Sequence, residues 1–120
     1  MDRPKLSGMR RFVLAWVNSW KGFKGAFKYE AAFRQEVGLA VVLLPLGAWL
    51  GATPVEKALL ISSVLLVLIV ELLNTGIETV VDRIGLERHE LSGLAKDVGS
   101  TAVLLSFAVL MVVWGFILLG

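Results

Sequence analysis

The chain contains no cysteine among its 120 residues, so disulfides and thiolate metal sites are excluded. It has little net charge, formally +2, because 12 basic and 10 acidic side chains nearly balance. The phosphate-binding patterns of soluble kinases are missing as well, since neither G-x-x-x-x-G-K-S/T nor G-x-G-x-x-G occurs. If the chain uses a nucleotide, it must hold it with carboxylates and basic side chains.

Apolar residues, in contrast, make up 57% of the chain, and the mean hydropathy is +0.78. That is too apolar for a soluble domain that must cover its own surface. Three apolar segments, 37–52, 56–84 and 99–119, can cross a bilayer of roughly 30 Å, the first with help from flanking residues. We therefore predict an all-α membrane protein with one domain over residues 1–120. The polar segment 85–98 is expected to be a loop between the last two spans.

The N-terminal segment 9–34 has a different pattern. Aromatic residues recur in it at three- and four-residue spacing, with lysines set around them: Phe12, Trp16, Trp20, Phe23 and Phe27. This pattern predicts an amphipathic helix in the headgroup layer of a membrane, and the alternative is a helix packed on a partner protein. Because charges interrupt its apolar residues, we expect no cleaved signal peptide. The basic residues interleave with aromatics, so we also expect no nucleic-acid partner.

Lysine and arginine are distributed unevenly around the three spans. Eight precede the first span, one lies between the first and second, three lie around the second loop, and none follows the third span. Because cytoplasmic loops carry the excess of basic residues, the N-terminus and the second loop are expected in the cytoplasm. The C-terminus is then expected on the external side of the membrane.

The second span contains polar residues that are costly in a membrane, since a central acidic residue costs about 2.5 to 3.5 kcal/mol to insert. At about 100° per residue, four of them share one face of the helix: Glu71, Asn74, Glu78 and Asp82. A single buried carboxylate can serve only to pair helices, and the last two carboxylates can simply be solvated. Two carboxylates with an amide between them exceed what pairing requires, so Glu71, Asn74 and Glu78 indicate an active site. For Asp82 both interpretations stay open.

The arrangement suits a particular chemistry. A carboxylate in a low-dielectric site, such as Glu71, suits a general base working near neutral pH. Glu78 lies nearer water and can bind a divalent cation through its oxygens. In the following segment, Lys96 can neutralise phosphate charge and Asp97 can bind sugar hydroxyls or metal. Such a site would take a hydroxyl from the lipid side and a charged co-substrate from the cytoplasm.

Other polar residues, taken alone, are more typical of a surface than of a site. His89 is the only histidine and lies in a polar stretch. Glu30 and Glu36 flank Arg34 at the entrance to the first span, where such charges commonly face the headgroups.

Several stretches closely resemble the small bacterial integral-membrane diacylglycerol kinases: EAAFRQE at 30–36, LISS at 60–63, VELLN at 70–74, IETVVDR at 77–83, HELSG at 89–93 and AKD at 95–97. The resemblance runs from Arg11 through the third span. It implies transfer of the γ-phosphate of MgATP to the primary hydroxyl of diacylglycerol, giving phosphatidic acid. It also implies a homotrimer with shared active sites in the bacterial inner membrane.

The resemblance also implies roles for individual residues. Glu71 matches the general base, and Glu30 and Glu78 match the carboxylates that hold metal ions on ATP. The implied ATP-binding residues are Arg11, Ser19, Glu30, Asn74, Glu78, Glu87, His89, Lys96 and Asp97. The implied lipid-substrate residues are Arg11, Ser19, Arg34, Glu36, Trp49, Glu71 and Ser100.

Three other functions compete with this interpretation. An undecaprenol kinase would have the same fold and chemistry but a longer, single-chain alcohol as substrate. A small proton-coupled transporter would use one intramembrane glutamate to exchange protons with a cationic drug. A structural assembly subunit would tolerate Ala at Glu71 and Glu78 apart from a loss of stability. The HELSG and AAFRQE stretches look more like the diacylglycerol enzymes than the undecaprenol enzymes.

Overall fold

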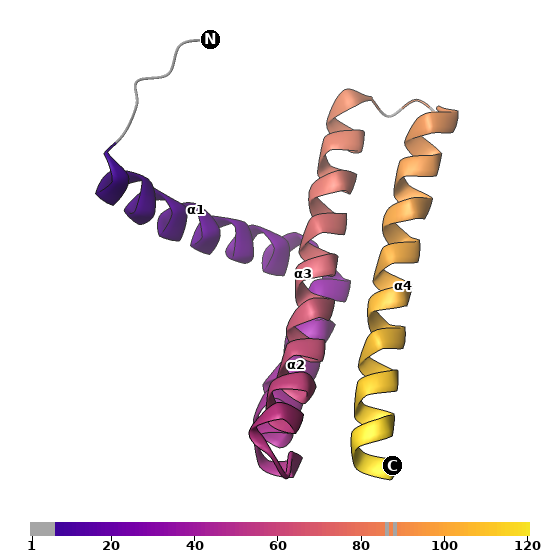
Figure 1. The fold of residues 1–120 in the computed structure, drawn as a ribbon. Helices are drawn as coiled ribbons and strands as arrows, with labels where there is room; N and C mark the ends of the chain where they lie inside the picture. The colour runs from indigo at the N-terminus through magenta and orange to yellow at the C-terminus, as the bar shows by residue number, and fades with distance from the viewer. Residues whose placement is uncertain (1–6, 86, 88) are drawn as a thin grey trace.

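The computed structural model describes residues 7–85, 87 and 89–120, which form four helices. They are α1 (Gly8–Tyr29), α2 (Ala31–Leu50), α3 (Pro54–Ile84) and α4 (Glu90–Leu119). The last three are long and apolar enough to cross a membrane. They lie side by side, with α3 antiparallel to both α2 and α4, and α1 leaves this bundle at a steep angle (Figure 1). The predicted all-helical fold with three candidate spans is confirmed.

The connection between α2 and α3 is short because its residues are suited to a tight turn. Thr53 caps α3, with its Oγ1 accepting a hydrogen bond from the Glu56 amide at 3.1 Å, and Glu56 Oε1 accepts one from the Ala52 amide at 2.9 Å. A Cβ at Gly51 would lie 2.8 Å from the backbone nitrogen of Lys57, so only glycine allows this close approach. Gly51, Thr53 and Glu56 therefore determine where α2 ends and α3 begins.

This turn sets the register of α2 against α3. A Cβ at Gly47 would lie 3.1 Å from Leu60 Cβ, so the two helices touch closely there. Counting eleven residues back along α2 and eleven forward along α3 brings Glu36 opposite Glu71. Between these levels the buried core contains Ala40, Val64, Val67 and Leu110. The hairpin geometry thus brings together two carboxylates that are far apart in the sequence.

A tryptophan joins α4 to the same region of α3. Trp114 Nε1 donates to Ser63 Oγ at 3.0 Å and to the Leu60 carbonyl at 3.2 Å. Ser63 is buried, and polar contacts of this kind hold spanning helices together where lipid offers no hydrogen-bond partners. The Trp114 ring also lies 3.4 Å from the Cβ position of Gly47, so all three spanning helices meet at this level.

Replacing Trp114 with Phe should lower the free energy of unfolding by about 0.6 to 1.7 kcal/mol, because both hydrogen bonds are lost. Thermal unfolding in detergent micelles measures the change. Trp49→Phe is the matched control, because Trp49 is 78% exposed. An equal loss of stability in both variants would contradict the role given to the Trp114 hydrogen bonds.

The first helix is shorter than the predicted segment 9–34. It ends at Tyr29, because Glu30 adopts an extended backbone (φ −115°, ψ 108°) that separates α1 from α2. The Arg34 guanidinium donates to the carbonyls of Phe27 at 2.8 Å and Lys28 at 2.9 Å. These bonds satisfy carbonyls in the last turn of α1 and allow the chain to change direction there.

The predicted loop 85–98 is also mostly helical. The connection after α3 is short, and α4 begins at Glu90, with His89 Nδ1 accepting a hydrogen bond from the Leu91 amide at 3.1 Å. Residues 86 and 88 of that predicted loop lie outside the described residues, as do residues 1–6 of the predicted domain. The polar composition of 90–98 reflects solvent exposure rather than an interruption of the helix.

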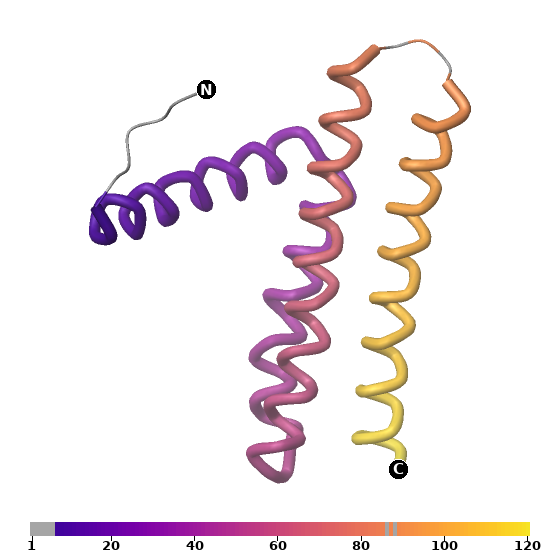
Figure 2. The backbone as a smooth tube through the Cα atoms, turned by 45° about the horizontal axis from the view of Figure 1, so that its top comes forward, coloured from indigo at the N-terminus to yellow at the C-terminus, as the bar shows by residue number. Residues whose placement is uncertain are grey.

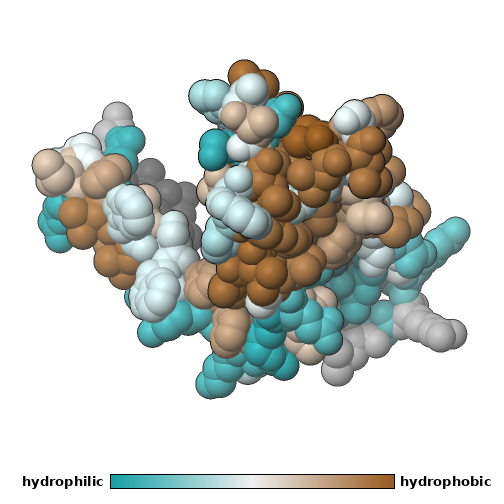
Figure 3. Space-filling model, turned by 90° about the horizontal axis from the view of Figure 1, so that it is seen from below, coloured by the Kyte–Doolittle hydropathy of each residue, from teal (hydrophilic) through white to brown (hydrophobic). Residues whose placement is uncertain are grey.

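α3 and α4 contain 31 and 30 residues, more than the roughly 20 that a crossing requires. Their ends near the 85–89 connection rise together beyond the start of α2, as the tube view shows (Figure 2). At the opposite end, seen from below, the surface over α2, α3 and α4 is largely apolar (Figure 3). The exposed apolar side chains there include Met111, Phe116 and Leu119, as expected for helices that face lipid.

Candidate active site

The polar face predicted for the second span lies on α3 and is partly buried. Glu71 is 4% exposed and Asn74 is 8% exposed, although both are polar. Asn74 Nδ2 donates to Glu78 Oε1 at 3.4 Å, one helical turn further along. The three residues therefore form one continuous strip of polar groups against the neighbouring helices.

Other carboxylates converge on Glu71. Glu36, from α2, lies opposite Glu71 across the close contact between α2 and α3, and its Oε2 is buried with no hydrogen-bond partner among the described residues. Glu78 and Glu30 lie close enough for their charges to act on Glu71. We call Glu30, Glu36, Glu71 and Glu78 the acidic cluster. Because carboxylates of like charge repel one another, the cluster favours a proton or a cation among its oxygens.

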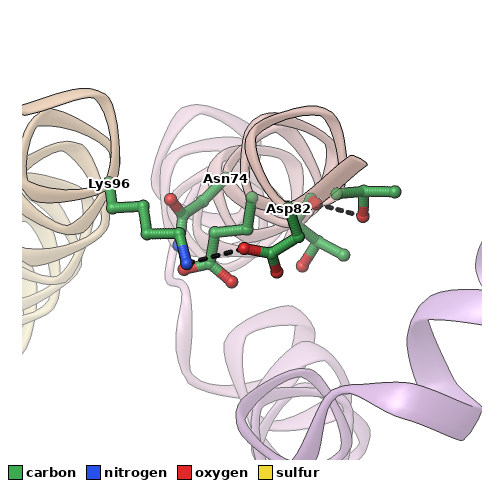
Figure 4. Close-up of polar contacts among 6 residues, drawn as sticks. Asn74, Asp82 and Lys96 are labelled. Carbon is green, nitrogen blue, oxygen red and sulfur yellow. Dashed lines mark hydrogen bonds and ion pairs between the residues drawn. The ribbon is translucent and has the colours of Figure 1, made fainter. Parts of the chain in front are cut away.

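α4 contributes a basic group to the same face. Lys96 Nζ lies 2.8 Å from Asp82 Oδ1, and Figure 4 shows Lys96 reaching from α4 across to the α3 face that carries Asp82 and Asn74. A cavity of about 260 Å³ beside this ion pair is lined in part by Glu87 and His89. Three predicted ATP-binding residues, Glu87, His89 and Lys96, therefore line one cavity.

A larger groove lies between α1 and α3. Its volume is about 910 Å³, and its wall is mostly apolar. Ser19 and Glu30 line it from one side, and Thr75 lines it from α3, one residue after Asn74. The hydroxyl oxygen of Thr75 is buried without a hydrogen-bond partner among the described residues. The groove thus combines room for hydrocarbon with a few polar groups close to the acidic cluster.

Some predicted site residues lie apart from this region. Arg11 is exposed near the end of α1 that points away from the bundle (Figure 1). Trp49 lies next to the α2–α3 turn, whereas about 25 Å of helix separates that turn from Glu71. Asp97 and Ser100, in contrast, lie on α4 within about one helical turn of Lys96, and both are exposed.

The acidic cluster has the donor chemistry of a site for a hard divalent cation, because such ions take carboxylate and phosphate oxygens. Across the described residues, no group of three or more histidine, aspartate or glutamate side chains is arranged to hold a metal ion by itself. The residues therefore fit a metal that is shared with substrate phosphates better than a metal enclosed by protein alone.

Three features of the site were not predicted from the sequence. The pairing of Glu36 with Glu71 follows from the α2–α3 register. Asp82 pairs with Lys96, a role that its position one turn after Glu78 makes possible. Gly99 packs against Asn74. The sequence feature that indicates this contact is a small residue three positions after Lys96, on the same helix.

Fold and site together define a class: a small membrane protein whose spanning helices carry an acidic cluster, an apolar groove and a second cavity lined in part by charged side chains. The model of the family described as prokaryotic diacylglycerol kinase matches residues 17–118. The chain belongs to this family and is an ATP-dependent lipid kinase of a bacterial membrane.

Similar proteins match the chain over nearly its whole length. A diacylglycerol kinase of Haemophilus influenzae is 53% identical over 114 residues, which cover 95% of this chain and 97% of the relative. One of Escherichia coli is 52% identical over 113 residues, which cover 93% of this chain and 92% of the relative. One of Helicobacter pylori is 40% identical over 117 residues, which cover 98% and 91%.

Proposed function

We propose that this chain transfers the γ-phosphate of MgATP to the primary hydroxyl of diacylglycerol, giving phosphatidic acid. The observation that carries the proposal is the buried carboxylate of Glu71 on α3, one residue before Leu72 in the wall of an apolar groove and in the acidic cluster with three further carboxylates. The names of the similar proteins support diacylglycerol as the substrate.

Glu71 acts as the general base. The hydroxyl oxygen of the lipid forms a bond to the γ-phosphorus while the bond from that phosphorus to the bridging oxygen breaks, and ADP leaves. The hydroxyl proton passes to the Glu71 carboxylate. Burial supports this role, because a dry, positioned carboxylate accepts a proton without having to shed bulk water. The neighbouring Glu36 supplies a second carboxyl group beside that of Glu71.

The lipid occupies the groove between α1 and α3. Its apolar wall suits acyl chains, and the polar residues Ser19 and Thr75 lie where the glycerol ester groups would need partners. Arg34, Glu36 and Ser100 are further lipid contacts in this proposal. Arg11 and Trp49, which lie apart within one chain, would reach a lipid bound at a neighbouring chain.

The nucleotide lies on the other side of Glu71, toward the cavity beside Lys96. Lys96 neutralises phosphate charge, Asn74 positions a phosphate oxygen, and Asp97 with Glu87 and His89 contacts the nucleoside. Glu30 and Glu78 would hold Mg²⁺. Such a metal supplies charge neutralisation of the phosphates, and positioning with charge stabilisation accounts for most of the catalysis of phosphoryl transfer.

The assembly proposed is a homotrimer with shared active sites, in which α1 lies in the headgroup layer. Phe12, Trp16 and Trp20 are each at least 60% exposed on α1, which supports contact with a membrane surface. The incomplete metal ligand set of one chain supports a site that is completed by a neighbour and by ATP. The basic residues before α2 support a cytoplasmic N-terminus and an external C-terminus.

An open apolar groove can also accept a polyprenyl chain, so undecaprenol is the alternative substrate. We expect phosphorylation of diacylglycerol in mixed micelles to exceed that of undecaprenol at equal mole fraction by roughly tenfold or more, since the two-chain lipid fills the groove better. Measuring both lipids side by side tests the substrate. Faster phosphorylation of undecaprenol would replace diacylglycerol in the proposal, and phosphorylation of neither would refute lipid kinase activity at this site.

A further inference from the structure

Gly99 is a buried glycine of α4 that directly faces Asn74. A Cβ added there would run into Asn74 Oδ1 and would lie 3.2 Å from Asn74 Cγ. Gly93 and Gly115 are on the same helix, and a Cβ at either would meet nothing within 4 Å. The lack of a side chain therefore matters at position 99 and not at these two other glycines of α4.

The Asn74 amide has two chemically different ends, so its orientation decides what it can do. Its Nδ2 donates to Glu78 Oε1 at 3.4 Å. Its Oδ1 is turned toward α4 and is buried, with no hydrogen-bond partner among the described residues. A methyl group at position 99 would occupy the space of Oδ1, so the amide would have to rotate and Nδ2 would leave Glu78.

The collision involves the tip of a flexible side chain rather than the backbone. The fold can therefore accommodate a methyl group by moving Asn74, without separating α3 from α4. A larger residue at position 99 therefore acts locally, because it displaces the Asn74 side chain within the polar strip of α3.

We infer that Gly99 is a positioning residue of the active site: the space at its missing side chain holds the Asn74 amide in the orientation that lets it contact Glu78. Gly99 touches no substrate and acts only through Asn74. The inference rests on the proposed function, in which Asn74 and Glu78 act on the phosphates and their metal ion.

Gly99→Ala should lower kcat/KM for MgATP by roughly ten- to a hundredfold, because small misplacements of a positioning group are costly in phosphoryl transfer. Gly115→Ala, the matched control on α4, should stay within about twofold of the parent chain. Steady-state kinetics in micelles with diacylglycerol measure both. Activity of Gly99→Ala within about twofold of the parent would overturn the inference.

A second readout separates positioning from a general packing role. The ¹⁵N side-chain amide signals of Asn74, identified by their loss in Asn74→Ala, should shift in Gly99→Ala and stay in place in Gly115→Ala. If Gly99→Ala loses activity while these signals do not move, Gly99 does not act through Asn74, and the inference is wrong.

A double variant covers the case in which Gly99→Ala does not fold. In Asn74→Ala/Gly99→Ala the colliding amide is gone, so the protein should fold and melt like Asn74→Ala alone. Failure of the double variant as well would mean that Gly99 serves backbone packing, which overturns the inference. Failure of the proposed function looks different: full activity in Asn74→Ala would refute the site role of Asn74 itself.

Discussion

Replacing Glu71 with Gln is expected to lower kcat for phosphorylation of diacylglycerol by roughly 10²- to 10⁴-fold, the range attributed to a general base. Glutamine keeps the size of the side chain and its hydrogen-bonding oxygen, but it cannot take the proton of the lipid hydroxyl. Glu71 is 4% exposed, so water has little access to replace the missing base. Steady-state assays in mixed micelles measure the loss.

The same substitution should leave the protein as stable as before or more stable. Glu71 is buried, so replacing its carboxylate with a neutral amide removes the cost of burying a charge. Glu56→Gln is the matched control on α3, because an amide oxygen can still accept the hydrogen bond from Ala52 that Glu56 Oε1 accepts now. A Glu71→Gln enzyme that retains more than a few per cent of activity would rule out the base assignment.

Replacing Lys96 with Met is expected to lower kcat/KM for MgATP by roughly 10²- to 10³-fold, the cost typical of losing one preorganised group that stabilises charge in the transition state. Methionine keeps an unbranched side chain but removes the ammonium group. In the structure Lys96 reaches across to the site face of α3 through its 2.8 Å contact with Asp82 (Figure 4). The change should fall on kcat more than on the KM for the lipid.

Asp82→Asn distinguishes the function of Lys96 from its ion pair. This variant removes the partner charge but keeps the ammonium group, so we expect a loss much smaller than that of Lys96→Met. Both side chains of the pair are about half exposed, and such pairs contribute little to stability. Equal losses in the two variants would indicate that the ion pair, rather than the lysine charge, is what the enzyme needs.

The spans and the polar strip of α3 could be predicted from the sequence because both depend on local periodicity. Glu71, Asn74 and Glu78 fall on one helical face by their spacing alone, and the structure joins Asn74 to Glu78 by a hydrogen bond. The proximity of Glu36 to Glu71 could not be predicted in this way. It depends on the register between two helices, which Gly51 and Gly47 set through close contacts with α3.

The helix boundaries show the same limit. The stretch 90–98 is polar and contains glycine, which is typical of a loop, yet it forms the first turns of α4 and packs beside α3 through Lys96. α1 ends before Glu30, where the Arg34 guanidinium binds carbonyls of the last turn of α1. The sequence periodicity predicted one continuous helix through these residues. Side-chain hydrogen bonds to nearby backbone groups, from Arg34 at the end of α1 and to His89 at the start of α4, mark both boundaries, and average helix propensity does not reveal them.

The most direct test of the account is transfer of label from ATP labelled at the γ-phosphate to diacylglycerol in mixed micelles, measured for the parent chain and for Glu71→Gln together. If Glu71 is the base of a lipid kinase, labelled phosphatidic acid forms only when both diacylglycerol and the parent chain are present, and the Glu71 variant forms almost none. ATP consumption that does not depend on the lipid, or equal labelling by both proteins, would contradict it.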